Sequence, residues 1–210
     1  MTPQAQFTLV APLAAGREAS LRALLATMNA TPGTADPHNS VLPFAAIERL
    51  HFARLVVLDD ALQVDLDRLG VPRPRLPTVL SFMGDCDGPA QEVLAELVQH
   101  AGEGLRRIFA HCEGFGADTD LLAWMQAHDR PIAASYVNWV GRTVRQIKEE
   151  SALQRALSAT VSRAMVNSGA QVRALHAELR SFVNSEARAG RLVLTPDAPT
   201  PLAWRVAKIA

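Results

Sequence analysis

The sequence has no excess of charge of either sign, and this absence disfavours two classes of partner. Its 210 residues contain 21 lysines and arginines and 21 aspartates and glutamates, so the formal net charge at pH 7 is zero. Nucleic acids and anionic membranes attract proteins that carry a positive field. We therefore expect a protein that binds neither nucleic acid nor a membrane.

Long apolar runs and abundant cysteines are also absent. No uncharged stretch approaches the roughly 20 residues that a helix needs to cross a bilayer. The first ten residues, MTPQAQFTLV, lack the basic region and apolar run of a leader peptide. The two cysteines, Cys86 and Cys112, are too few for a disulfide framework. These features predict a cytoplasmic protein with free thiols; a Cys86–Cys112 disulfide is the alternative.

No motif of a catalytic or metal site is present. Potential ligand atoms cluster in two runs, DCD at 85–87 and HCE at 111–113, but there is no CxxC, HExxH or HxH pattern. A zinc ion needs about four ligands that converge at roughly 2.0–2.3 Å. Leu105, Ile108 and Cys112 recur at helical spacing, so Cys112 is expected in the core as a small apolar side chain. We expect no metal site.

Strand-like and helical patterns alternate through the first two thirds of the chain. Strands are expected near 7–11, 50–58, 78–83 and 131–139, helices near 21–28 and 93–101, and shorter helices near 105–112 and 120–127. Polar connections are expected at 31–40 and 59–76, and the first of these loops could lie over a cleft. The order predicts an α+β fold, a ferredoxin-like sandwich with a four-stranded antiparallel sheet and helices on one face.

The last third is helical in pattern and differs from the rest. Two apolar stripes, at 144–165 and 172–183, flank a break at Asn167, Ser168 and Gly169. We therefore divide the chain into a ferredoxin-like domain at 1–141 and a helical extension at 142–210. Such helices need cover, so the extension is expected to pack on the domain or on a partner subunit. The open sheet face also needs cover, which predicts a homo-oligomer, most simply a dimer.

Three side chains on the expected strands are candidate ligand-binding residues. Arg54 shares a sheet face with Phe52 and Val56, and a cation there needs a carboxylate, a carbonyl or a ligand anion. His51 lies near the start of the opposite face, and a histidine there is available for acid–base chemistry. Tyr136, the only tyrosine, could point into a cavity. The structural alternatives are an ion pair or an extended stem for Arg54, a surface histidine, and a core tyrosine.

His111 and Glu113 are the candidate catalytic residues. His111 could act as a general base and Glu113 as the group that orients it, provided that both face a cleft beside the sheet. The alternative is structural, because a histidine at a helix C-terminus is favoured by the helix dipole and Gly114 is suited to end that helix. Cys86 is expected in an exposed turn before a helix, where the dipole lowers the pKa of a thiol and the flanking Asp85 and Asp87 raise it.

Three runs carry a resemblance to a known group of proteins. The segments LHFARLVVLDD, SFMGDCDGP and GLRRIFAHCEGF resemble a bacterial domain of the ferredoxin-like dimeric α/β-barrel group, over about residues 5–140. That group includes antibiotic-biosynthesis-type monooxygenases, chlorite dismutase-like proteins and dye-decolourising peroxidases. The resemblance implies a fold, dimers and an oxidative function. We do not expect haem, and the cofactor is unknown.

Three functions remain open from the sequence. The first is an oxidoreductase-like enzyme with a cavity between sheet and helices. The second is a module that binds a small molecule without chemistry. The third is an interaction protein that forms homodimers. A closed cavity lined by His111 and Arg54 would favour one of the first two, and a sheet face packed by the C-terminal helices would remove the argument for a dimer.

Overall fold

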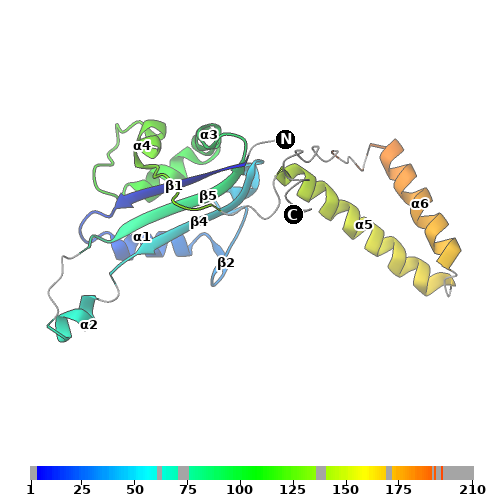
Figure 1. Cartoon of the computed structure of the whole chain (residues 1–210), viewed down its shortest axis with the longest axis horizontal. Coiled ribbons are helices and arrows are strands. Elements are labelled where there is room, and N and C mark those ends of the chain that lie inside the picture. Colours follow the sequence, from blue (N-terminus) through cyan, green and yellow to red (C-terminus); the bar gives the residue numbers. More distant parts are fainter. Residues whose placement is uncertain are drawn as a thin grey trace, which may run out of the picture. The chain divides into compact units, whose positions relative to one another are not determined.

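The chain divides into two compact units, Pro3–Val140 and Gly141–Ala210 with Met1–Thr2. The computed structural model describes residues 4–60, 63–70, 76–135, 141–168 and 172–190, together with 192 and 195. The larger unit mixes helices and strands, and the smaller one holds two long helices (Figure 1). Among the helices described, none is both long and apolar enough to span a membrane.

A three-stranded antiparallel sheet forms the centre of the larger unit. It consists of β1 (Gln4–Pro12), β4 (Leu50–Leu58) and β5 (Val79–Asp87) in the order β1-β5-β4, so β5 is central. The alternation predicted for the first strand is confirmed, because Phe7, Leu9 and Ala11 are buried. The two faces predicted for 50–58 also hold for residues 52–58, whose register on β5 is regular.

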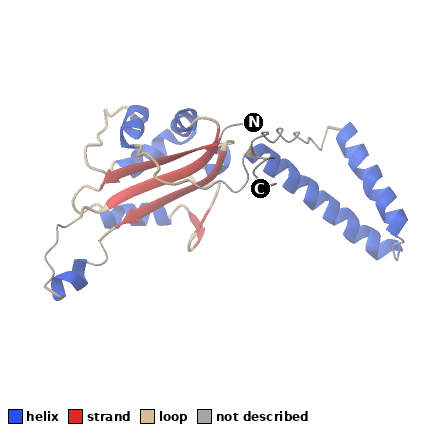
Figure 2. Ribbon diagram, viewed as in Figure 1, coloured by secondary structure: helices blue, strands red, loops and turns tan. Residues whose placement is uncertain are grey.

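Three helices cover one face of this sheet (Figure 2). They are α1 (Glu18–Ala26), α3 (Ala90–Phe109) and α4 (Leu121–His128). Asp120 caps the N-terminus of α4, because its side chain accepts a hydrogen bond from the Ala123 N–H at 3.0 Å. The core between sheet and helices is filled with buried apolar side chains: Phe7, Leu9, Leu21, Leu80, Phe82, Leu94, Leu97, Leu105, Ile108 and Met125.

The second long helix runs further than its sequence suggests. We expected it to end before Gly102 and a separate helix to follow, but α3 continues to Phe109 with a kink at Ala101 (φ −136°, ψ 20°). Gly104 lies just past the kink, where an added Cβ would fall 1.6 Å from the Val41 carbonyl oxygen. Gly104 is therefore a packing residue that lets the 41–42 segment touch the helix. Gly102, where we expected the helix to end, lies within it.

The segment at 31–40 is not the open loop that we expected. A small hairpin, β2 (Asn29–Thr31) with β3 (Thr34–Ala35), forms there, followed by a turn around buried Asn39. The Asn39 side chain accepts hydrogen bonds from the Val41 and Leu42 N–H groups. A short 3-10 turn, Phe44–Ala46, leads into β4. The connection after β4 also contains a helix, α2 (Gln63–Arg68).

The strand expected at 131–139 is not formed in its described part. Residues 131–135 are not in a strand, and residues 136–139 lie outside the described residues. The chain touches β1 only briefly before this point, through an isolated bridge of Asp129 to Leu9 and a hydrogen bond from the Arg130 N–H to the Thr8 carbonyl oxygen at 2.9 Å. Pro131 follows and has no N–H to continue a ladder.

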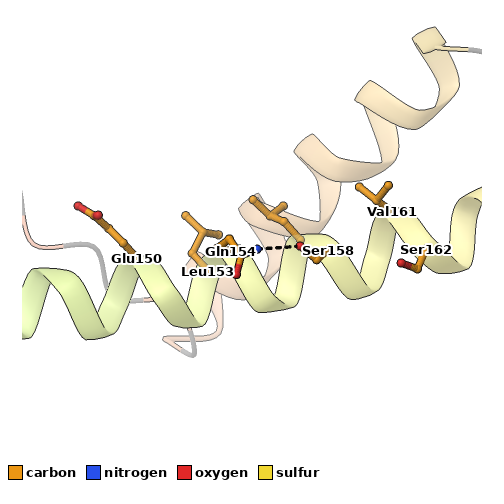
Figure 3. A pocket seen from close by; sticks show the side chains of 7 residues that line it. Glu150, Leu153, Gln154, Ser158, Val161 and Ser162 are labelled. Atoms are coloured by element: carbon orange, nitrogen blue, oxygen red, sulfur yellow. Dashed lines mark hydrogen bonds between the residues drawn. The ribbon is translucent and has the colours of Figure 1, made fainter.

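The smaller unit contains both predicted C-terminal helices, α5 (Val144–Ser168) and α6 (Val172–Arg188). The α5 side chains Leu153, Leu157 and Val161 line one open hollow of about 500 Å³. Figure 3 shows Leu153 and Val161 pointing to the same side of α5, with Gln154 bonded to Ser158 at 3.2 Å. These apolar side chains are only half-buried.

Candidate functional site

The most compact polar arrangement lies at the end of the sheet where β5 leads into α3. His51 Nε2 and Asp87 Oδ1 are 2.8 Å apart, and their side chains are 17% and 7% exposed. The amide nitrogen of Gln4 lies 3.5 Å from the same ring nitrogen. One residue from each of the three strands thus contributes to this cluster, which we call the His51 cluster: Gln4, His51 and Asp87.

A β-bulge places His51 in this cluster. The register of β4 on β5 shifts between Leu50, opposite Cys86, and Phe52, opposite Asp85, so His51 is the extra residue. Asp87 is the last residue of β5 and lies opposite Gln4 of β1. A carboxylate that accepts from one ring nitrogen orients the imidazole and leaves the other nitrogen available to a ligand. The cluster can therefore position a histidine for proton transfer or for binding.

A second charged group ties the start of β4 to α3. Arg49 donates through its Nε to Glu96 at 3.0 Å and through a terminal nitrogen to Glu92 at 2.7 Å. These partners raise the pKa of Arg49 above its ordinary value, the hydrogen bond to Glu92 contributing most. The Asp87 N–H also donates to the Arg49 carbonyl oxygen at 2.8 Å. Arg49 thereby supports the backbone beside the His51 cluster.

Both cysteines are free and buried. Burial raises the pKa of Cys86 to about 11 and that of Cys112 to about 12. We expected Cys86 in an exposed turn, which is wrong: β5 continues to Asp87, so Cys86 lies within the strand, is 0% exposed and faces the core. Its Sγ donates to the Ala5 carbonyl oxygen at 3.4 Å. The burial predicted for Cys112 is confirmed.

His111 and Glu113 lie just beyond the C-terminus of α3, far along the chain from the His51 cluster. His111 Nδ1 donates to the carbonyl oxygens of Arg107 (3.0 Å) and Ile108 (3.1 Å) at the end of the helix, and the His111 N–H also donates to the Ile108 carbonyl oxygen at 3.2 Å. Glu113 is exposed, and its N–H donates to the Pro12 carbonyl oxygen. No hydrogen bond or ion pair joins these two side chains within the described part of the chain. Tyr136 lies outside that part.

Arg54 lies on the sheet face opposite α1, α3 and α4. Its guanidinium carbon is 5.0 Å from the centre of the Phe52 ring, in a cation–π contact. Arg54 makes no ion pair with any residue that the structure describes. No described hydrogen bond or ion pair links Arg54 to the His51 cluster or to His111, so the four predicted residues that the structure describes do not form one site.

Two hollows border this region. The larger, about 650 Å³, lies along the outer edge of β4 and is bounded on its far side by α1, the β2–β3 hairpin and Phe44. The smaller, about 210 Å³, lies over the open sheet face, between Ile132 and Ala134 on one side and Thr8, Met83 and Asp85 on the other. Asp85 accepts a hydrogen bond from Gln6 there at 2.5 Å. These hollows are on the edge and the open face of the sheet, not in the core beneath it.

No protein-family model matches the chain, and no curated protein or solved structure matches it either. Within the described ranges, no group of three or more histidine, cysteine, aspartate or glutamate side chains is arranged to hold a metal ion. Reasoning about function therefore rests on the geometry of the chain itself.

Sequence reasoning overlooked the partners of His51. The sequence places Asp87 in a turn, and no pattern in the sequence indicates that Gln4 lies near His51. The two positions lie 36 and 47 residues from His51 along the chain, so only the strand register brings them together. A hint was available in the polar run DCDG, which is unusual at the end of a buried strand.

Proposed function

We propose that this chain is a cytoplasmic association module, a ferredoxin-like unit that forms a homodimer through the open face of its sheet. One observation carries the proposal. The helices α1, α3 and α4 of the larger unit cover one face of the sheet, while Phe52 and Leu58 on the other face are 46% and 50% exposed. Large apolar side chains on an uncovered sheet are typical of a surface that a partner covers.

The strand order supports the ferredoxin-like assignment. Such a unit has two βαβ halves, and its first and third strands pair at the centre of the sheet. Here β1 pairs with β5, the third long strand, and β4 pairs with its other side. The position of a fourth strand is the outer edge of β1, which is where the Asp129–Leu9 bridge brings the chain. The resemblance described above implies the same fold and a dimer.

The open face is also suited to meet a copy of itself. A two-fold interface requires a patch that complements itself, because each residue meets its counterpart across the axis. The face carries a cation, Arg54, and a carboxylate, Asp85, among the half-buried side chains of Val10, Val56 and Met83. In a face-to-face pair, Arg54 of one copy can approach Asp85 of the other, and the apolar side chains fill the centre.

Light scattering of the purified full chain tests this proposal. We expect the wild-type chain to be a dimer. Met83→Glu introduces a charge into the centre of the face and should give a monomer. Ala123→Glu, on the exposed side of α4, should leave the dimer unchanged. Arg54→Asp should weaken the dimer and Arg54→Asp with Asp85→Arg should restore it. A monomeric wild-type chain at every concentration would overturn the proposal, as would a dimer that none of the face variants affects. Circular dichroism establishes that each variant is folded.

A small-molecule site is the second candidate, favoured by the hollow over the same face. Its carboxylate, Asp85, lies beside an opening between the sheet and residues 132–134. An oxidoreductase-like enzyme or a non-catalytic binder would hold its ligand there. Native and denaturing mass spectrometry of the purified protein tests this candidate. A bound ligand would give the native protein an excess mass that is lost on unfolding. This excess should also be lost in Asp85→Asn and kept in Asp118→Asn. Equal native and denatured masses per chain count against it.

A further inference from the structure

The outer edge of β4 offers unpaired backbone groups. In the order β1-β5-β4 this nine-residue strand is at the edge of the sheet. In an edge strand every second residue directs its N–H and C=O away from the sheet. From Phe52 to Leu58, the only backbone partners among the described residues are those of β5.

The groove of about 650 Å³ lies against this edge. Its lining includes six consecutive residues of β4, from Phe52 to Val57. Successive side chains of a strand point to opposite faces, so a cavity on one face would be lined by every second residue only. Six consecutive residues can line one groove only when the groove faces the edge of the strand, where the backbone groups are.

The opposite wall of the groove is largely apolar. It is formed by the end of α1, with Leu25 and Ala26, by Met28, by the β2–β3 hairpin, with Ala35, and by Phe44. A strand paired with β4 would place alternate side chains toward this wall. The other side chains would lie beside the open face of the sheet, next to Arg54, whose guanidinium has no ion pair with a described residue.

We propose that this groove binds an extended segment of a partner protein, which adds to β4 as a further strand and alternates apolar and acidic side chains. The apolar residues face Leu25, Met28 and Phe44, and an acidic residue faces Arg54. Arg22, at the same groove, is already bound to Glu18 and Asp59. Main-chain hydrogen bonds supply affinity in this mode of recognition, and the alternate side chains supply specificity.

A second copy of the chain fits this edge less well than a single strand does. Copies that joined edge to edge would pair β4 with β4, and each would bring its own β2–β3 hairpin into the groove of the other. The hairpin forms part of the groove wall and projects past β4 (Figure 1). A single added strand needs only about 4.8 Å beside β4, whereas a second copy would also need room for its own hairpin.

The test uses the full chain and a synthetic probe, an acetylated and amidated ten-residue peptide of alternating valine and glutamate. Isothermal titration calorimetry should show saturable binding, weakened about tenfold or more when lysine replaces glutamate, as charge complementarity with Arg54 requires. Two further peptides carry N-methyl groups on either all the valines or all the glutamates. Because only alternate N–H groups of an added strand face β4, one methylated peptide should bind and the other should not.

Variants of the groove complete the experiment. Ala26→Trp and Ala35→Trp fill the groove from α1 and from the hairpin, and each should weaken peptide binding about tenfold or more, whereas Ala123→Trp on α4 should not. Hydrogen exchange should show outward amides of β4 that are protected only when the peptide is present. The proposal is wrong if the parent peptide does not bind saturably or if both methylated peptides bind equally. It is also wrong if Ala26→Trp lowers the mass of the free protein, which would assign the groove to a second copy.

Discussion

Gly84 of β5 lies directly opposite Phe7 of β1, and the ring of Phe7 covers it. A Cβ added at Gly84 would lie 2.5 Å from the Phe7 Cζ and 3.0 Å from the Phe52 carbonyl oxygen. The ring cannot move aside easily, because Phe7 is buried and packs edge-on against Phe82 with ring centres 5.2 Å apart. The packing of Phe7 against the central strand therefore leaves no room for a side chain at residue 84.

Replacement of this glycine by alanine should destabilise the fold. We expect Gly84→Ala to lower the free energy of unfolding by about 1–3 kcal/mol, because the added methyl group overpacks a closed site. Urea denaturation measures the change. The matched control is Gly102→Ala in α3, where the nearest atom lies 3.9 Å from an added Cβ. There the same substitution should be neutral or stabilising by up to about 1 kcal/mol. Equal effects at the two sites would contradict this account.

The His51 cluster predicts an energetic coupling between its two ionisable residues. We expect a double-mutant cycle of His51→Gln and Asp87→Asn to give an interaction energy of about 1–2 kcal/mol in the free energy of unfolding, because the two side chains are in contact. The control cycle pairs Asp87→Asn with His111→Gln. His111 follows the opposite end of α3, a helix of 20 residues and roughly 30 Å in length, so these effects should add. Coupling as large in the control cycle would contradict the prediction.

The strands and helices could be predicted where burial imposes a period. Phe7, Leu9 and Ala11 alternate because one face of β1 is in the core. Residues 50–58 predict β4 with its observed bounds because β-branched and aromatic side chains are concentrated there. The end of β5 could not be predicted. Its residues, GDCD, have the composition of a turn, but pairing with β1 on one side and β4 on the other holds them in the strand. Tertiary pairing overrides local preference there.

The candidate site is harder to predict from the sequence than the fold. His51 was recognised as a residue with useful chemistry, but its place depends on a bulge, and one inserted residue leaves no periodic signal. His111 and Glu113 are close in sequence, yet no hydrogen bond joins their side chains in the described part of the chain, because the His111 ring folds back onto the end of α3. Proximity in sequence indicated a pair where local geometry favours a helix cap.

The two glutamates on α3 that bind Arg49 should contribute unequally. Glu96 is 18% exposed and also accepts from the Glu48 N–H at 3.2 Å, whereas Glu92 is 59% exposed. We expect Glu96→Gln to cost about 1 kcal/mol of unfolding free energy and Glu92→Gln less than about 0.5 kcal/mol, since solvent screens the outer pair. Urea denaturation at low and high salt checks both values. A larger effect for Glu92→Gln would contradict the argument from exposure.

The two buried thiols predict a specific loss of stability in alkali. Burial raises the pKa of Cys86 to about 11 and of Cys112 to about 12 from an ordinary value of 9.0. Between pH 9 and 11 the unfolded chain loses thiol protons that the native chain keeps, so the native state binds more protons and the free energy of unfolding falls as the pH rises. The contribution of the two protonated thiols to the free energy of unfolding is fully present below about pH 9.

Two measurements check this prediction. Replacement of both cysteines, as Cys86→Ala with Cys112→Ala, should flatten the fall in unfolding free energy between pH 9 and 11, whatever its cost at neutral pH, because the linked thiol protons are gone. At pH 8, Ellman's reagent should react with two thiols per chain in denaturant and only slowly with the native protein, since the reactive thiolate is scarce and enclosed. Rapid reaction of one native thiol would contradict the burial of that cysteine.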